Sequence, residues 1–135
     1  MYKQVKFITN IPYKDSSTYY LFNKSKNTLI PIEISKESNE DATPSLYNSM
    51  KRLVYALGYS FLCLKIYKFD QNIFYTYLSI YKNGNSESVM DINIGFSDGI
   101  EISKETSIPI YINEEIIKQV GFVVTRKLVE KALSI

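Results

Sequence analysis

Three consecutive segments rich in aromatic and β-branched residues constrain the fold of this chain most. They span residues 59–69, 73–82 and 87–94, with short polar stretches between them. Such segments are typical of β-strands, and connections this short allow only antiparallel pairing between neighbours. The Asn83-Gly84 pair suits a two-residue type I′ turn, in which both positions need positive φ. The sequence therefore predicts a run of antiparallel hairpins in the middle of the chain.

The predicted turn also sets a register for the second hairpin. It places Leu78 opposite Val89 and Tyr75 opposite Ile92, so that apolar side chains occur on both faces of the sheet. A sheet that is apolar on both faces is covered on both, either by helices or by a second subunit. We therefore expect helices around the sheet and a homo-oligomer.

Four other segments have strand patterns. Alternation or a short apolar run marks residues 2–9, 18–24, 28–35 and 108–112. Pro31 lies inside the third of them and predicts an edge position or a bulge, because proline cannot donate a ladder hydrogen bond.

Apolar residues at helical spacing mark three further segments. The clearest runs from Pro44 or Ser45 to Gly58, and its apolar stripe consists of Leu46, Met50, Leu53, Val54 and Leu57. Another begins after Asn113 and ends at Gly121, and the last covers residues 122–135. Residues 1–135 are therefore expected to form one α+β domain, a mostly antiparallel sheet with a central hairpin, packed against three or four helices.

The residue types that are missing limit the chemistry. The chain has no histidine and one cysteine, Cys63, which excludes a zinc site of the usual kind and the commonest general base. Any metal would be a hard ion, Mg²⁺ or Mn²⁺, held by carboxylates; we expect no haem and no nucleotide cofactor. The net charge of +2 is too small to indicate nucleic-acid binding by itself. No apolar run is long enough for a membrane span, and we expect a cytoplasmic protein with no membrane partner.

The stretch DINIGFSDGIEIS, residues 91–103, raises the question of a catalytic site. It predicts a strand that reaches Gly95, a turn, and a short helical segment that opens at Ser97 and Asp98. Ser97 suits a helix N-cap and Asp98 suits the positive end of the helix dipole. A Ser-Asp pair at the mouth of such a turn also suits a catalytic site, and the residues alone leave both interpretations open.

Four motifs together resemble one family, the bifunctional nuclease (BFN) domain. They are TLIPIEIS, TPSLYNSMKRLVYALG, IFYTYLSIYKNG and MDINIGFSDGIEISKETSIPIYINEEII, and they follow the order and spacing of the family pattern over residues 28–121. The chain departs from that pattern at residues 43–48, where basic, histidine and acidic positions are lost. It departs again at residues 93–96, where an aspartate and an arginine are lost, whereas Ser97 and Asp98 are retained.

The resemblance implies hydrolysis of DNA and RNA phosphodiesters without sequence preference, a reaction often assisted by metal ions on carboxylates. It implies Asp98 and Ser97, the retained family positions, as catalytic residues. Asp91 is not the family's acid, but it lies two residues before Asn93 on a strand and so on the same face, which makes it a third catalytic candidate. The carboxylates that could hold the metal are Asp91, Asp98, Glu114 and Glu115, and the basic residues concentrated enough to meet phosphate are Arg126 and Lys127. The lost family positions leave a second interpretation open, a catalytically degenerate, oligomeric binding or regulatory module.

Structural explanations exist for the same residues. Glu114 and Glu115 suit the start of a helix, and Asp91 suits an exposed strand position opposite Thr76. Three tyrosines share one face of their predicted strand and a fourth lies nearby. Rings in such a row stack on bases in single-strand binders, whereas an apolar sheet face in a small domain is more often core or subunit interface. These tyrosines are Tyr75, Tyr77 and Tyr81, with Tyr67 nearby.

Overall fold

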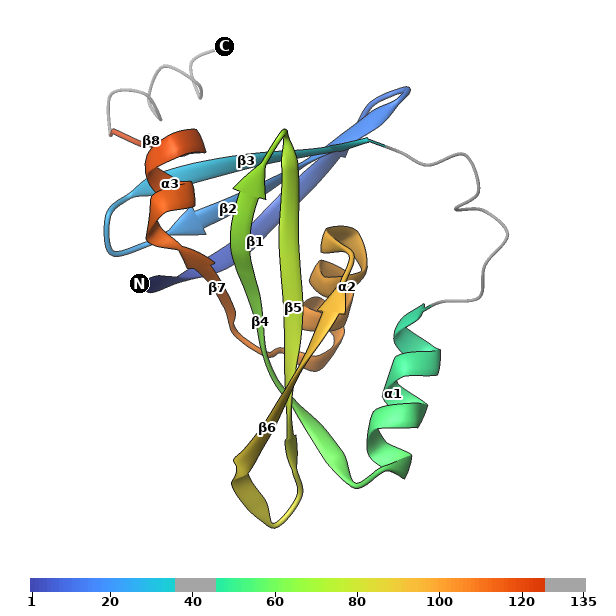
Figure 1. Cartoon of the computed structure of the whole chain (residues 1–135). Coiled ribbons are helices and arrows are strands. Elements are labelled where there is room, and N and C mark those ends of the chain that lie inside the picture. Colours follow the sequence, from blue (N-terminus) through green and yellow to red (C-terminus); the bar gives the residue numbers. More distant parts are fainter. Residues whose placement is uncertain (36–45, 126–135) are drawn as a thin grey trace.

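The computed structural model describes residues 1–35 and 46–125, which form one eight-stranded sheet with three helices (Figure 1). The strand order across the sheet is β6-β5-β4-β7-β1-β2-β3-β8. Neighbouring strands are antiparallel, except β4 and β7, which are parallel. In chain order the elements are β1 (Tyr2–Pro12), β2 (Ser16–Asn23), β3 (Thr28–Ser35), α1 (Leu46–Ala56), β4 (Tyr59–Asp70), β5 (Ile73–Lys82), β6 (Asn85–Ile94), α2 (Phe96–Thr106), β7 (Ile110–Asn113), α3 (Glu114–Val120) and β8 (Phe122–Val123).

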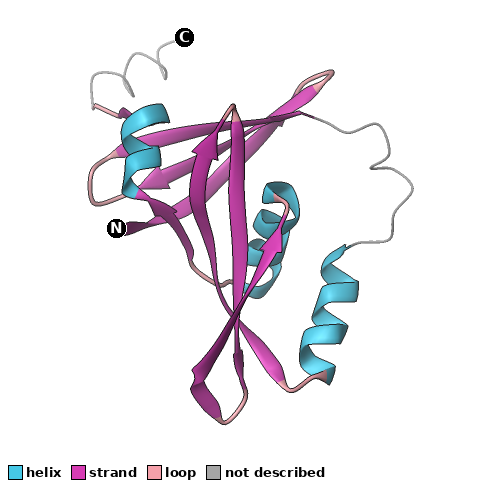
Figure 2. Ribbon diagram, in the orientation of Figure 1, coloured by secondary structure: helices cyan, strands magenta, loops and turns pink. Residues whose placement is uncertain are grey.

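This architecture corrects the expected fold class. The described chain is mainly strand, with helices of 11, 11 and 7 residues, and is not a helix-rich α+β packing (Figure 2). The sheet is mixed because β7 follows the crossover helix α2 and enters the middle of the sheet, parallel to β4 and antiparallel to β1. The β4–β5 hairpin, expected at the centre, therefore lies toward one end of the strand order.

The last expected helix, residues 122–135, is not helical at its start. Phe122 and Val123 form β8, which pairs with Leu29 and Thr28 of β3. The remainder of that predicted helix, from residue 126 onward, lies outside the described residues. Pro31 of β3 lies beyond the two residues that β8 covers, which agrees with the predicted edge position.

The β5–β6 register differs from the expected one. Lys82 pairs with Asn85 across the predicted turn, but a bulge between Tyr81 and Lys82 places Leu78 opposite Ile92 instead of Val89. Gly84 has a φ of 83°, whereas Asn83 is not among the residues with positive φ, so the turn is not type I′. The prediction of two apolar sheet faces, which rested on this register, was therefore wrong.

The apolar face of the sheet, here called the inner face, carries the core and the helices. Val54 of α1, Ile100 of α2 and Ile116 of α3 are all buried against inward-pointing strand residues. A Cβ placed on Gly99 would lie 2.7 Å from Cδ1 of Leu64, so the backbone of α2 lies directly against β4. The opposite face, here called the outer face, carries none of the three described helices.

The end of α1 and the start of α3 follow the sequence signals, whereas the apolar stripe of α1 does so only in part. Gly58 has a φ of 81° just after α1, as expected of a C-terminal glycine. Of the predicted stripe, Val54 is buried, but Leu53 and Leu57 are 58% and 62% exposed. The start of α3 is confirmed, because Oδ1 of Asn113 accepts a hydrogen bond of 3.0 Å from the amide of Glu115. None of the helices in the described ranges combines the length and hydropathy that crossing a membrane requires.

Candidate functional site

Ser97 and Asp98 lie in the first turn of α2, but Ser97 is not its N-cap. The N-cap is Gly95, which has extended backbone angles and no side chain to accept a hydrogen bond. Asp98 is the only acid in that first turn, where the helix dipole favours a negative charge. Its Oδ2 lies 3.5 Å from the position that a Cβ on Gly95 would occupy, so the carboxylate bends back toward the entry of the helix.

Partial burial raises the pKa of the Asp98 carboxyl above its usual 3.8. The folded chain therefore holds this proton to a higher pH than the unfolded chain does. Stability is then lost as the pH rises from 3.8 through the folded pKa, and the loss is complete above it.

We expect Asp98→Asn to remove this pH dependence. The free energy of unfolding of the wild type should fall, relative to that of the variant, as the pH rises from about 4 to about 7. The difference should not exceed about 1 kcal/mol, because water still reaches the carboxylate. Urea unfolding across this pH range measures it, and Glu101→Gln on the same helix controls for the loss of one negative charge. A difference of the opposite sign would contradict the burial of Asp98.

Asp91 lies on the outer face of β6, on the other side of the sheet from α2. It pairs with Ser79, not with Thr76, and its Oδ1 accepts a hydrogen bond of 2.6 Å from the Ser79 hydroxyl. Asn93 projects from the same face, as the two-residue spacing predicts. Asp91 and Asp98 therefore do not face a common site, even though seven positions separate them in the sequence.

Glu114 and Glu115 begin α3 and are ion-paired with lysines. Glu114 contacts Lys26 at 2.8 Å and Glu115 contacts Lys118 at 3.4 Å. The hydrogen bond and charge of Lys26 lower the pKa of the Glu114 carboxyl. These contacts agree with the structural explanation, in which both acids stabilise a helix start.

The four candidate ligand acids are not gathered in one place. Asp98 follows Ile94 of β6 by four residues, and Glu114 follows Ile112 of β7 by two. Ile94 and Ile112 belong to one row of paired residues that crosses β5 and β4. Three strand spacings separate them, about 14 Å. Among residues 1–35 and 46–125, no three acidic or cysteine side chains lie close enough to hold a metal ion. These residues do not fit a protein-held divalent site, and we derive no catalytic step through a metal.

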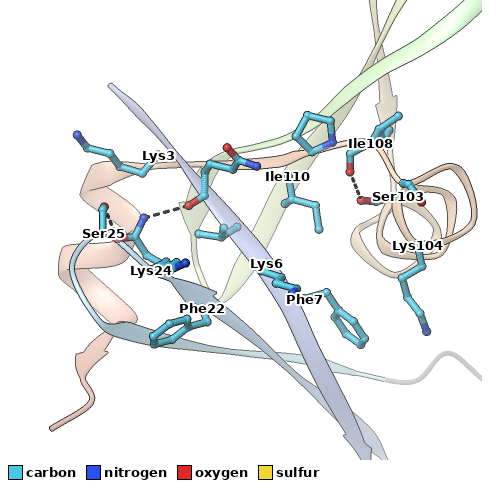
Figure 3. Close-up of a pocket in the computed structure, with 15 residues that line it drawn as sticks. Lys3, Lys6, Phe7, Phe22, Lys24, Ser25, Ser103, Lys104, Ile108 and Ile110 are labelled. Atoms are coloured by element: carbon cyan, nitrogen blue, oxygen red, sulfur yellow. Dashed lines mark hydrogen bonds between the residues drawn. The ribbon is translucent and has the colours of Figure 1, made fainter. Parts of the chain in front are cut away.

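A different set of residues comes together beside β1. A groove of about 1220 Å³ lies between the start of β1, the β2–β3 turn and the end of α2 (Figure 3). Its charged lining residues are four lysines, and none of the described residues that line it is acidic. We call it the lysine groove; its lysines are Lys3, Lys6, Lys24 and Lys104.

Local contacts fix the walls of the lysine groove. Asn23 is only 2% exposed, and its Nδ2 donates a hydrogen bond of 3.0 Å to the backbone oxygen of Gln4, which ties the β2–β3 turn to β1. On the opposite wall, the Ser103 hydroxyl donates to the backbone oxygen of Ile108 at 2.9 Å. Nζ of Lys104 lies 4.9 Å from the centre of the Phe7 ring, a cation–π contact that directs this amine along the groove wall.

The lysine groove was not predictable from the sequence. Its lysines come from positions 3 to 104 and no local pattern links them, so only the pairing of β1 and the path of α2 bring them together. The basic residues that the sequence did favour, Arg126 and Lys127, lie outside the described residues.

Comparison with known proteins agrees with the motif pattern. Residues 23–125 match the family model described as the bifunctional nuclease domain. Bifunctional nuclease 1 of Oryza sativa subsp. indica and the bifunctional nuclease of Oryza minuta are each 29% identical to this chain over 73 residues. The aligned part is 54% of this chain but only 22% of each rice protein. Because the family model covers most of the sequence, the chain belongs to the bifunctional nuclease (BFN) domain family.

Proposed function

We propose that this domain binds DNA or RNA by the phosphodiester backbone, without sequence preference, in the lysine groove. The observation that carries the proposal is the gathering of four lysines, with no acid among the described lining residues, in a member of the BFN family. Lysine contacts with phosphate release counterions and give affinity that does not depend on base sequence.

The dimensions of the lysine groove also suit a polymer. Its volume of about 1220 Å³ exceeds the roughly 300–1,000 Å³ of most small-molecule pockets. Phe7 and Phe22 line it together with the lysines, so the groove offers apolar ring surface as well as positive charge. Sugar and base can contact the rings while the phosphates meet the amines.

Binding is tested by titrating labelled single-stranded DNA and RNA of one length and mixed sequence, with EDTA present. If each groove lysine neutralises one phosphate, the logarithm of the association constant falls with the logarithm of salt concentration with a slope of about −2.8. The affinity should be similar for unrelated sequences. Absence of binding at low salt, or affinity that does not respond to salt, would overturn the proposal.

Hydrolysis of the bound phosphodiester is the second candidate function, supported by family membership and by the name of the rice relatives, bifunctional nucleases. Asp98 is its best candidate residue here, with Ser97 beside it and Asp91 on the other face. The assay adds Mg²⁺ or Mn²⁺, the predicted cofactors, to single-stranded DNA and RNA with wild type and Asp98→Ala. Cleavage that depends on Asp98 supports an enzyme. Binding without cleavage supports the degenerate binding or regulatory module.

Two further expectations belong to the same proposal. A homo-oligomer is tested by the mass of the chain in solution, and a cytoplasmic location by fractionation of cells that express it. Leu53 of α1 and Leu57, which directly follows that helix, are exposed apolar side chains that a second copy could cover.

A further inference from the structure

The outer face of the sheet carries a group of tyrosines and lysines, here called the tyrosine face. β5 points Phe74, Leu78 and Ile80 to the inner face, and Tyr75 and Tyr77 point outward. The bulge between Ile66 and Lys68 in β4 turns Tyr67 toward these rings. The tyrosine face consists of Tyr2, Lys65, Tyr67, Lys68, Tyr75 and Tyr77.

The rings of the tyrosine face are close enough to form one surface. The Tyr67 ring centre lies 5.1 Å from that of Tyr77 and 6.3 Å from that of Tyr75. The Tyr67 hydroxyl lies 3.4 Å from Oδ1 of Asn93, to which it donates a hydrogen bond. Tyr75 is 37% exposed and Tyr67 and Tyr77 are half-buried, so all three rings are partly exposed to solvent.

The charge on this face suits a polyanion. Nζ of Lys65 lies 5.1 Å from the Tyr2 ring centre and 5.7 Å from that of Tyr77, and Nζ of Lys68 lies 5.4 Å from that of Tyr75. Each amine thus lies over a ring in a cation–π contact, and a base that stacks on the ring takes the place of this flexible side chain. Two acids lie at the borders of this face: Asp91 on β6, which is hydrogen-bonded to Ser79, and Asp70 at the end of β4, two residues after Lys68.

The tyrosine face meets the lysine groove at Gln4, which projects from the outer face. Gln4 lines the groove, lies opposite Tyr111 in the β1–β7 ladder, and Tyr111 lies opposite Lys65 in the β7–β4 ladder. Lys65 in turn lies opposite Tyr77. The groove wall at Gln4 is therefore two strand spacings from Lys65, about 10 Å. One strand of nucleic acid can cross this distance while remaining on the protein.

We propose that the tyrosine face is a base-stacking platform for single-stranded nucleic acid that continues from the lysine groove, with Tyr67 and Tyr75 as the stacking rings. This inference rests on the proposed function, because the groove supplies the phosphate contacts. Stacking needs unpaired bases, so the platform gives a preference for single strands over duplexes that lysines alone do not give. A second copy of the chain is the other candidate occupant of this face.

The test measures binding of three labelled probes to the full chain in EDTA. The probes are a single-stranded oligonucleotide, its duplex, and an abasic oligomer of the same length. The variants are Tyr67→Ala and Tyr75→Ala, the conservative changes Tyr67→Phe and Tyr75→Phe, and Tyr55→Ala, an exposed tyrosine of α1, as the control. Each alanine variant should bind the single strand about 5- to 150-fold more weakly, with an unchanged salt slope because no charge is lost. Binding of the duplex and the abasic oligomer should not change, and the phenylalanine variants should bind like the wild type.

The outcomes separate this inference from the proposed function. If the wild type binds none of the probes, both fail. If it binds with the expected salt slope and the alanine variants bind equally well, the stacking platform alone is wrong and the groove stands. If the alanine variants change the mass in solution and leave single-strand affinity unchanged, the face is an interface between two copies, which overturns the platform.

Discussion

Replacing Ile112 with alanine is expected to lower the free energy of unfolding by about 2–5 kcal/mol. The Ile112 side chain is fully buried, at 0% exposed. It lies on β7, which joins the two halves of the sheet, where it pairs with Ile66 of β4 on one side and with Lys3 of β1 on the other. A cavity at this position is surrounded by paired strands that cannot move inward to fill it. We therefore expect a cost in the upper part of the range.

Urea unfolding followed by circular dichroism measures this loss, and Ile73→Ala is the matched control. Ile73 is also a strand isoleucine but is 52% exposed at the start of β5, so its replacement should cost less than about 1 kcal/mol. A loss of several kcal/mol is a large fraction of the roughly 5–15 kcal/mol that stabilises a typical domain. Equal losses in the two variants would show that β7 is not the centre of the cooperative unit.

Local sequence patterns predicted most of the individual elements. The β4, β5 and β6 segments, the end of α1 at Gly58 and the cap at Asn113 were all recognisable, because each depends on residues close together in the chain. The order of the strands in the sheet was not predictable in the same way. The place of β7 between β4 and β1 depends on pairing across long sequence separations, and this pairing makes the sheet mixed.

The faces of the sheet were predicted wrongly for a specific physical reason. A bulge beside Lys82 moves the partner of Leu78 from Val89 to Ile92, and no pattern in the sequence around the turn predicts this bulge. With the observed register, Ile92 and Ile94 of β6 join the apolar residues of β5 on the inner face, opposite to Tyr75 and Tyr77. One local irregularity thus decides which β6 residues join the core.

The candidate site was likewise predictable only where its residues are close together in the sequence. The motif retained from the family, Ser97-Asp98, was found from the sequence and does lie at the start of a helix. The acids expected to join it were chosen because each lies near a strand end or a helix start, yet Asp91 faces the other side of the sheet and Glu114 is paired with Lys26. The lysine groove needed the three-dimensional structure, since its residues share no motif.

The second large effect is expected from neutralising two lysines of the groove. Lys6→Gln together with Lys24→Gln removes two phosphate contacts, which should make the salt slope less negative by about 1.4. Extrapolated from a reference of 1 M salt, the same relation predicts single-strand affinity about 60-fold weaker at 50 mM salt. Both side chains are exposed, so the fold should be retained, and circular dichroism verifies this.

The control for this variant carries the same charge change at sites outside the groove. Lys14 lies in the β1–β2 turn and Lys82 at the end of β5, and both are exposed and absent from the groove lining. Lys14→Gln with Lys82→Gln lowers the net charge equally, so it should alter affinity about twofold at most if binding is confined to the groove. Because only position distinguishes the two double variants, equal losses would mean that overall charge attracts the nucleic acid and that the groove is not its site. A loss confined to Lys6 and Lys24 would locate the phosphate path between β1 and the β2–β3 turn, on the side from which Gln4 leads to the tyrosine face.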